Sequence, residues 1–255
     1  MKDSDCYSFK LINQTDDPIL KNVDLAIVLT MENSSRKFDD PVLLKLAKLT
    51  CVQINKGFKN KLGVNSATED IIHAYKNVFK NTLNYNNIII FEDDAVYNTK
   101  YSIDSFKSID AFIKNNYFSI YSLGNLSIDL PDISDHRRIL AGFGACHAVI
   151  YSPHVRKKLL NSTGWMYDVD ILGNLPDKYK HKYPLVCQTF PETDSRKEWE
   201  LFFRNFGALR GISLLNGDKK IEPFWSSMYL ISNCIFYILL LIVILIVILI
   251  VRKML

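Results

Sequence analysis

Residues 88–94 read IIIFEDD, four large apolar side chains followed directly by three acids. A short continuous apolar run with polar residues after it is typical of a strand that is buried on both faces. Such strands belong to parallel sheets covered by helices, and the ligands of these sheets bind beyond the carboxyl ends of the strands. The three acids therefore stand where a ligand is expected.

Three adjacent acids repel one another, and burying them is unfavourable unless a cation or hydrogen-bond donors compensate. Because side chains alternate along a strand, we expect Glu92 and Asp94 on one side and Asp93 on the other. Two carboxylates on one side suit a hard divalent cation, which also holds a diphosphate as it leaves. The pattern predicts a metal–diphosphate site, and a strand end with solvated acids is the alternative.

Helices and strands alternate on both sides of this stretch. Ser66-Ala67-Thr68-Glu69 is a capping box and predicts a helix that extends to about Leu83. The other expected elements are strands at 23–29, 51–54, 118–123, 140–151 and 185–188, and helices at 42–49, after an N-cap at Asp40, and from 152–153 onward. The alternation predicts an α/β fold with a mostly parallel sheet, in one domain over residues 21–222 that follows a polar leader at 1–20.

The C-terminal part of the chain has a different composition. Residues 228–251 contain no charge, and 24 residues of helix span roughly 36 Å, more than a bilayer core of about 30 Å. Aromatic and basic residues flank the run, as at membrane interfaces. We expect a transmembrane helix here, and a buried core helix is the alternative.

The N-terminal residues suggest a topology. The first nine residues contain no apolar core of a signal peptide. Together with the C-terminal helix, this predicts a tail-anchored, single-pass protein with its main domain in the cytosol, on a host or virion membrane. The net charge of +4 is modest, the five cysteines are scattered, and no nucleic-acid-binding motif is present, so nucleic acid is not an expected partner.

Several segments resemble one family. Residues 88–97, IIIFEDDAVY, resemble the "ILIxEDDA" segment of family 25-like glycosyltransferases, which act in lipopolysaccharide biosynthesis or galactosylate procollagen. The further similar segments are 23–36, like the family's first strand and arginine-bearing loop; 121–124, like "xxLG"; 144–152, like "GTxGYxIS"; and 167–170, like "xxDxxL". The acidic block is the specific part of this resemblance.

The resemblance implies a fold and an activity. The fold is the nucleotide-sugar-binding, GT-A-like α/β arrangement, and the activity is that of a hexosyltransferase. The implied reaction moves a sugar from a nucleotide-diphosphate donor to a hydroxyl on a protein or glycan, with Mn²⁺ or Mg²⁺ as the metal and inversion at the sugar carbon. The residues it assigns are Glu92 and Asp94 for the metal, Arg36, Glu92 and Asp93 for the donor, and Asp168 or Asp170 for the base.

Other interpretations stay open at this stage. In the alternative interpretation, Asp168 or Asp170 caps a loop and Arg36 is an ordinary surface residue. Gln188 and Thr189 are candidates for the acceptor cleft. For the whole chain, the alternatives are an inactive, transferase-like structural protein of a membrane or virion, and a metal-dependent nucleotidyl- or phosphotransferase.

Overall fold

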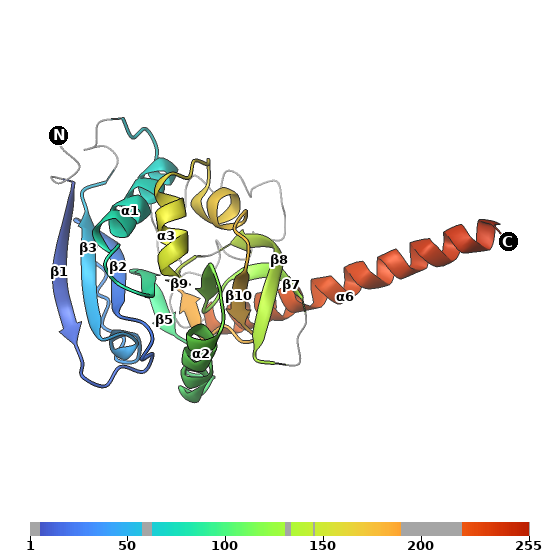
Figure 1. Cartoon of the computed structure of the whole chain (residues 1–255), viewed down its shortest axis with the longest axis horizontal. Coiled ribbons are helices and arrows are strands. Elements are labelled where there is room, and N and C mark those ends of the chain that lie inside the picture. Colours follow the sequence, from blue (N-terminus) through green and yellow to red (C-terminus); the bar gives the residue numbers. More distant parts are fainter. Residues whose placement is uncertain (1–5, 58–62, 131–133, 145, 190–220, 255) are drawn as a thin grey trace.

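The computed structural model of the chain describes residues 6–57, 63–130, 134–144, 146–189 and 221–254 (Figure 1). The strands are β1 (Tyr7–Gln14), β2 (Leu25–Met31), β3 (Leu49–Asn55), β4 (Ile88–Glu92), β5 (Ala95–Tyr97), β6 (Ile120–Ser122), β7 (Leu126–Leu130), β8 (His136–Gly144), β9 (Ala148–Tyr151), β10 (Lys178–His181) and β11 (Val186–Gln188). The helical elements are η2 (Leu43–Lys45), α1 (Ala67–Asn81), α2 (Asp104–Asn115), α3 (Pro153–Leu160), η4 (Tyr167–Leu172) and α6 (Ile221–Met254).

Nine strands form one sheet in the order β1-β3-β2-β4-β9-β6-β10-β8-β7, and β5 and β11 form a small second sheet. Strands β3, β2 and β4 are parallel, as are β6 and β10. The remaining neighbouring pairs are antiparallel: β1 with β3, β4 with β9, β9 with β6, β10 with β8, and β8 with β7. The expected α/β fold is confirmed, and the expected mostly parallel sheet is a mixed one, with three parallel and five antiparallel pairs.

Strand β4 is buried on both faces, as its apolar run predicts. Ile89 and Phe91 pack in one cluster with Phe106 of α2, whereas Ile88 and Ile90 pack in a second cluster with α1 and α3. Figure 1 shows α2 on one side of the sheet and α1 and α3 on the other. Two cores thus hold β4 in place up to its acidic end.

Helix α1 confirms the capping box. The Ser66 side chain accepts a hydrogen bond from the backbone N–H of Glu69, and the Glu69 carboxylate accepts one from the N–H of Asn65. The side chains of Ile72, Tyr75, Val78 and Phe79 form its buried face, and Leu83, where the predicted helix ends, is exposed. Local sequence signals were sufficient to place this helix.

The predicted polar leader is wrong for the described part of residues 1–20, because residues 7–14 form strand β1. This strand pairs antiparallel with β3 and makes one edge of the large sheet. Residues 7–11 alternate apolar and polar side chains, as strands often do, but most of the side chains of β1 are exposed on either face. Its main-chain hydrogen bonds with β3 hold it instead.

Two further predicted elements differ from the structure. Residues 42–49 form only the short 3-10 turn η2, since Leu49 already pairs in β3; the Asp40 carboxylate still caps the turn by accepting from the N–H groups of Val42 and Leu43. Residues 140–151 form two strands, because β8 pairs with β7 and β10 while β9 lies between β4 and β6.

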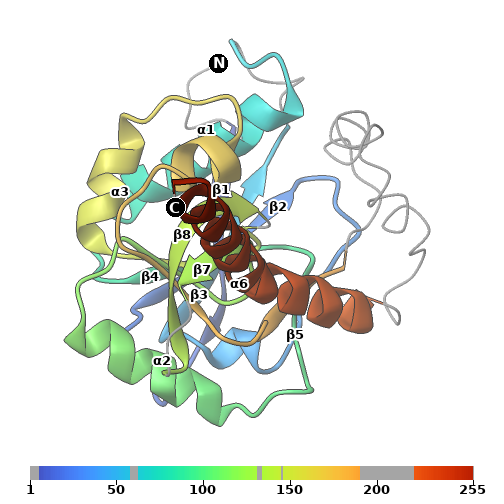
Figure 2. The same ribbon diagram turned by 90° about the vertical axis from the view of Figure 1, so that its right-hand side faces the viewer.

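The apolar C-terminal run lies in a single long helix, α6, which projects from the domain (Figures 1 and 2). Its segment Cys234–Lys253 is long and apolar enough to cross a membrane, and none of its most apolar part is buried against the rest of the chain. This excludes the alternative of a buried core helix. The predicted C-terminal end of the main domain, residues 190–220, lies outside the described residues.

Candidate active site at the end of strand β4

The acidic turn after β4 is held between two neighbouring strands. The backbone N–H of Glu92 donates to the carbonyl of His147, just before β9, and the N–H of Thr189, just after β11, donates to the carbonyl of Asp94. The side chains of Asp93 and Asp94 are 7% and 6% exposed, and Glu92 is half-buried. The fold thus keeps all three carboxylates mostly out of water.

Asp93 is satisfied from within the chain. Its Oδ2 accepts hydrogen bonds from the hydroxyls of Thr30 (2.6 Å) and Ser34 (3.0 Å). Its Oδ1 lies 2.6 Å from Nη1 of Arg36. Asp93 therefore ties the loop after β2 to the end of β4 and orients Arg36, whose Nη1 also lies 3.8 Å from Oδ2 of Asp94.

Glu92 and Asp94 share a different partner, as the alternation of side chains predicts. The amide nitrogen Nε2 of Gln188 donates to Oε2 of Glu92 (2.9 Å) and to Oδ2 of Asp94 (3.2 Å). Oδ1 of Asp94 is buried and has no hydrogen-bond partner among the residues that the structure describes. The sulfur of Cys146 donates to Oε1 of Glu92 over 3.6 Å.

The two carboxylates are poorly stabilised as anions. Burial, Asp94 and then Asp168 raise the pKa of Glu92 to about 8. Burial also raises the pKa of Asp94 to about 6, with Arg36 opposing and Asp93 adding to the shift. Three acids against one arginine leave an excess of carboxylate groups, and a bound cation would oppose the upward shift of both pKa values.

A divalent metal fits this set of donors only together with a substrate. Within the described ranges, no group of three or more His, Cys, Asp or Glu side chains is arranged to hold a metal. Mg²⁺, however, is commonly bound through one or two carboxylates, with substrate phosphates completing its shell. The unpartnered Oδ1 of Asp94 and the neighbouring Glu92 meet that requirement.

The aromatic core positions the η4 segment beside the acids. Tyr167 stacks on Tyr75 with ring centroids 3.8 Å apart, and its hydroxyl donates to that of Tyr151 (3.1 Å). The next residue, Asp168, is half-buried and close enough to Glu92 to raise its pKa. Asp170 faces the preceding turn, where its Oδ2 accepts from the N–H groups at 165 and 166 (2.9 Å each).

The structure therefore brings together most of the residues that the sequence singled out. Arg36, Glu92, Asp93 and Asp94 form one cluster with Asp168 near it, whereas Asp170 acts as a cap. Sequence reasoning missed Thr30, Ser34 and Cys146, and it assigned Gln188 to an acceptor cleft. These four carry no local signal, because each reaches the acids from another strand or loop.

A glycine is required beside the site. A Cβ atom on Gly124 would lie 2.0 Å from the carbonyl oxygen of Val186 and 3.1 Å from Nε2 of His147. Nε2 of the buried His147 is 2.9 Å from that same carbonyl oxygen. His147 is thus packed in the sheet and is not part of the acidic cluster.

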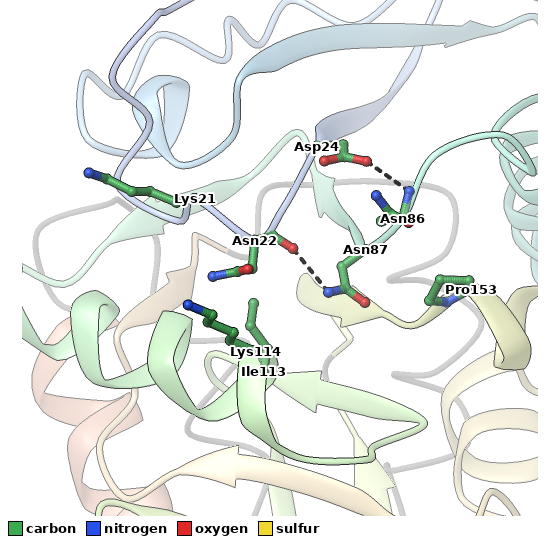
Figure 3. A pocket seen from close by; sticks show the side chains of 8 residues that line it. All are labelled: Lys21, Asn22, Asp24, Asn86, Asn87, Ile113, Lys114 and Pro153. Carbon is green, nitrogen blue, oxygen red and sulfur yellow. Dashed lines mark hydrogen bonds between the residues drawn. The ribbon is translucent and has the colours of Figure 1, made fainter.

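A surface depression of about 390 Å³ lies at the other end of β4 (Figure 3). Its polar groups are partly paired with one another: the Asp24 carboxylate accepts from the N–H of Asn86 (2.8 Å), and Nδ2 of Asn87 donates to the carbonyl of Asn22 (3.0 Å). The lining residues are Lys21, Asn22, Asp24, Asn86, Asn87, Ile113, Lys114 and Pro153. This depression is separate from the acidic site.

No protein-family model matches the chain, and no curated protein matches it in sequence. The crystal structure of A197 from STIV is similar to it, with a TM-score of 0.45 and 12% identity, over 68% of this chain and 87% of that chain.

Proposed function

We propose that the chain is a metal-dependent glycosyltransferase that moves a sugar from a nucleotide-diphosphate donor to a hydroxyl acceptor on a protein or glycan. The observation that carries the proposal is the pair of carboxylates at the end of β4, the half-buried Glu92 and the buried Asp94, with one oxygen of Asp94 left without a hydrogen-bond partner among the described residues. Structural acids rarely stay in this condition, because burying a charge without compensation is costly.

Each residue of the cluster has a defined part in this proposal. Glu92 and Asp94 would hold Mn²⁺ or Mg²⁺, and Gln188 would keep their carboxylates together. The bound metal would neutralise the charge of the departing diphosphate. Arg36, oriented by Asp93 and with its side chain 27% exposed, would contact a donor phosphate.

Asp168 is the better candidate for the base, because it lies near Glu92 and its Oδ1 accepts from the adjacent N–H of Val169, whereas Oδ2 of Asp170 is held by two backbone amides across a turn. In the proposed step Asp168 accepts the proton of the acceptor hydroxyl as the acceptor oxygen bonds to the anomeric carbon. The bond from that carbon to the diphosphate breaks, and the nucleoside diphosphate leaves with the electron pair. Attack opposite the leaving group inverts the configuration.

We further propose that α6 anchors the chain in a membrane, with the main domain on the cytosolic side. The apolar segment Cys234–Lys253 supports the anchor, since it is long enough for a bilayer core and stays outside the packed domain. The topology is testable through glycosylation sequons. Asn33 and Asn161 are exposed, and we expect neither to be glycosylated in a eukaryotic host; a glycosidase-sensitive mass shift at either residue would place the domain in the lumen.

Ligand binding tests the enzymatic part. Thermal melts of the full chain in detergent would be recorded with UDP or GDP, each with Mn²⁺ and with chelator. A nucleoside diphosphate at 100 times its dissociation constant should stabilise the fold by about 2.7 kcal/mol, in the presence of metal only. Release of the nucleoside diphosphate from UDP- and GDP-sugars would then be measured under the same conditions.

The same measurements separate the rival interpretations. An inactive structural domain would show neither stabilisation nor release of nucleoside diphosphate. A nucleotidyltransferase would instead consume nucleoside triphosphates and release pyrophosphate. Activity that persists in chelator would contradict the metal-dependent mechanism.

A further inference from the structure

The segment that carries Asp168 has an apolar face toward water. Within it, Tyr167, Ile171 and Leu172 are buried, whereas Trp165 is 65% exposed and Val169 is 48% exposed. The backbone of Trp165 is fixed, since its N–H donates to the carboxylate of Asp170. A rigid turn therefore presents an indole ring and a valine outward, which is unfavourable in water and typical of side chains that meet a membrane interface.

The outer face of the β7–β8 hairpin is apolar in part, with the exposed Arg138 opposite Leu130 and paired with Asp177. Asp129 and Ile139 point into the domain and are buried, while Leu130 is 43% exposed and Leu140 is 48% exposed. Strand β8 contacts η4, so the two sets of exposed side chains come from neighbouring elements.

The hairpin lies on the side of the domain from which α6 departs (Figures 1 and 2), and η4 is next to the hairpin, because α6 contacts β7 and β8 contacts η4. The apolar span begins at Cys234, 13 residues after the start of α6, so about 20 Å of helix precedes it. Strand β1 lies on the opposite side of the domain (Figure 1). A bilayer crossed by α6 would therefore be close to η4 and the hairpin and far from β1.

We propose that Trp165, Val169, Leu130 and Leu140 form a lipid-docking surface that rests on the membrane crossed by α6. The proposal relies on the proposed anchor and is independent of any catalytic activity. Because the anchor already holds the domain at the membrane, a small apolar surface is sufficient to orient the domain on the bilayer. Because Asp168 and Asp170 flank Val169, docking depends on insertion of apolar side chains and not on attraction to anionic lipid.

Docking would also restrict the acceptor. Asp168 is adjacent to Val169, so the rim of the acidic site would lie at the lipid surface. If the proposed transferase activity is present, its acceptor hydroxyl belongs to a molecule held at the membrane.

Quenching of tryptophan fluorescence by brominated lipid tests the surface. The chain has three tryptophans, and Trp199→Phe with Trp225→Phe leaves Trp165 alone. The full chain is reconstituted in phosphatidylcholine vesicles with or without bromine on the acyl chains. We expect brominated lipid to reduce Trp165 emission about twofold, and high salt to leave the quenching unchanged.

Two matched variants make the outcome decisive. Both variants keep Trp199→Phe and Trp225→Phe and add Trp165→Phe, so that a single new tryptophan is the probe. Leu11→Trp places this tryptophan on the exposed strand β1, and Ile244→Trp places it in the apolar span. We expect no quenching at position 11 and strong quenching at 244. If 244 is quenched while Trp165 is quenched no more than position 11, the docking surface is wrong and the anchor stands. Absence of quenching at 244 overturns both.

Discussion

Two clusters of acidic and basic side chains in the sheet differ in their balance of charge. At the end of β4, three acids face the single cation Arg36. Between β7, β8 and β10, the single acid Asp129 faces two cations: its oxygens lie 2.8 Å from Nζ of Lys180 and 3.1 Å from Nη1 of Arg137. The side chains of Asp129 and Lys180 are fully buried.

The difference separates a structural role from a binding role. Buried charge is tolerated where the chain itself supplies the opposite charge, and the Asp129 cluster meets this condition. In the β4 cluster the chain supplies only one cation for three acids, so the full negative charge of this cluster is stabilised only when a cation binds. The first cluster should therefore matter for folding and the second for activity.

The largest expected effect is on the stability of the paired cluster. Lys180→Met leaves the buried carboxylate of Asp129 with Arg137 alone, and breaking a buried pair typically costs about 3–5 kcal/mol. Thermal or denaturant unfolding of the full chain in detergent measures this. The double variant Lys180→Met with Asp129→Leu should recover part of the loss, because it removes the charge that the single change leaves behind. A loss below about 1 kcal/mol would show that the pair is dispensable.

Asp94→Asn should affect activity instead. The change keeps the size of the side chain and removes the charge that the metal requires, so transfer should fall by about 10²–10³-fold. The melting temperature should stay the same or rise, since repulsion with Glu92 and Asp93 is relieved. Asp104→Asn removes an exposed acid of α2 and serves as the control. Activity within about threefold of the native chain would contradict the metal–diphosphate assignment.

The stability of the metal-free protein should also depend on pH. The pKa of Glu92 rises from its ordinary value of 4.5 to about 8 on folding. Between these values the folded chain binds more protons than the unfolded chain, so stability falls as pH rises through this window. Unfolding in chelator from pH 5 to pH 8 measures the slope. Glu92→Gln should flatten the dependence of the unfolding free energy on pH. An unchanged slope in that variant would show that a group other than Glu92 causes the pH dependence.

The smallest expected effect concerns a buried amide beside the paired cluster. Asn125 is fully buried, and neither of its side-chain polar atoms has a hydrogen-bond partner among the described residues. Asn125→Leu should therefore stabilise the fold by about 1 kcal/mol. The matched control is Asn98→Leu, which should destabilise, because Asn98 is buried with its amide bonded to the carbonyl of Pro184 and the N–H of Lys100. Loss of stability in Asn125→Leu would mean that this amide has a function in the fold.

The elements that could be predicted are those whose signal is local. The apolar run at 88–91, the capping box at 66–69 and the apolar C-terminal helix each contain their own explanation within a few residues. The sequence analysis does not predict β1, although residues 7–11 alternate apolar and polar side chains; its pairing with β3 is what shows it to be a strand. The sequence predicts a single strand at residues 140–151, because apolar composition does not reveal that the chain changes its neighbours between β8 and β9.

The sequence by itself determined that three acids follow a doubly buried strand and that a span of apolar helix ends the chain, since burial pattern and hydropathy are properties of contiguous residues. Only the tertiary structure decided which acids are satisfied. The carboxylate of Asp93 is bound by Thr30, Ser34 and Arg36. Gln188 binds Oδ2 of Asp94, whose Oδ1 has no hydrogen-bond partner among the described residues. Likewise Lys180 neutralises Asp129 across 51 positions of sequence. A buried charge is stabilised by whatever lies within a few ångströms of it, and that neighbourhood is set by how the strands are ordered in the sheet.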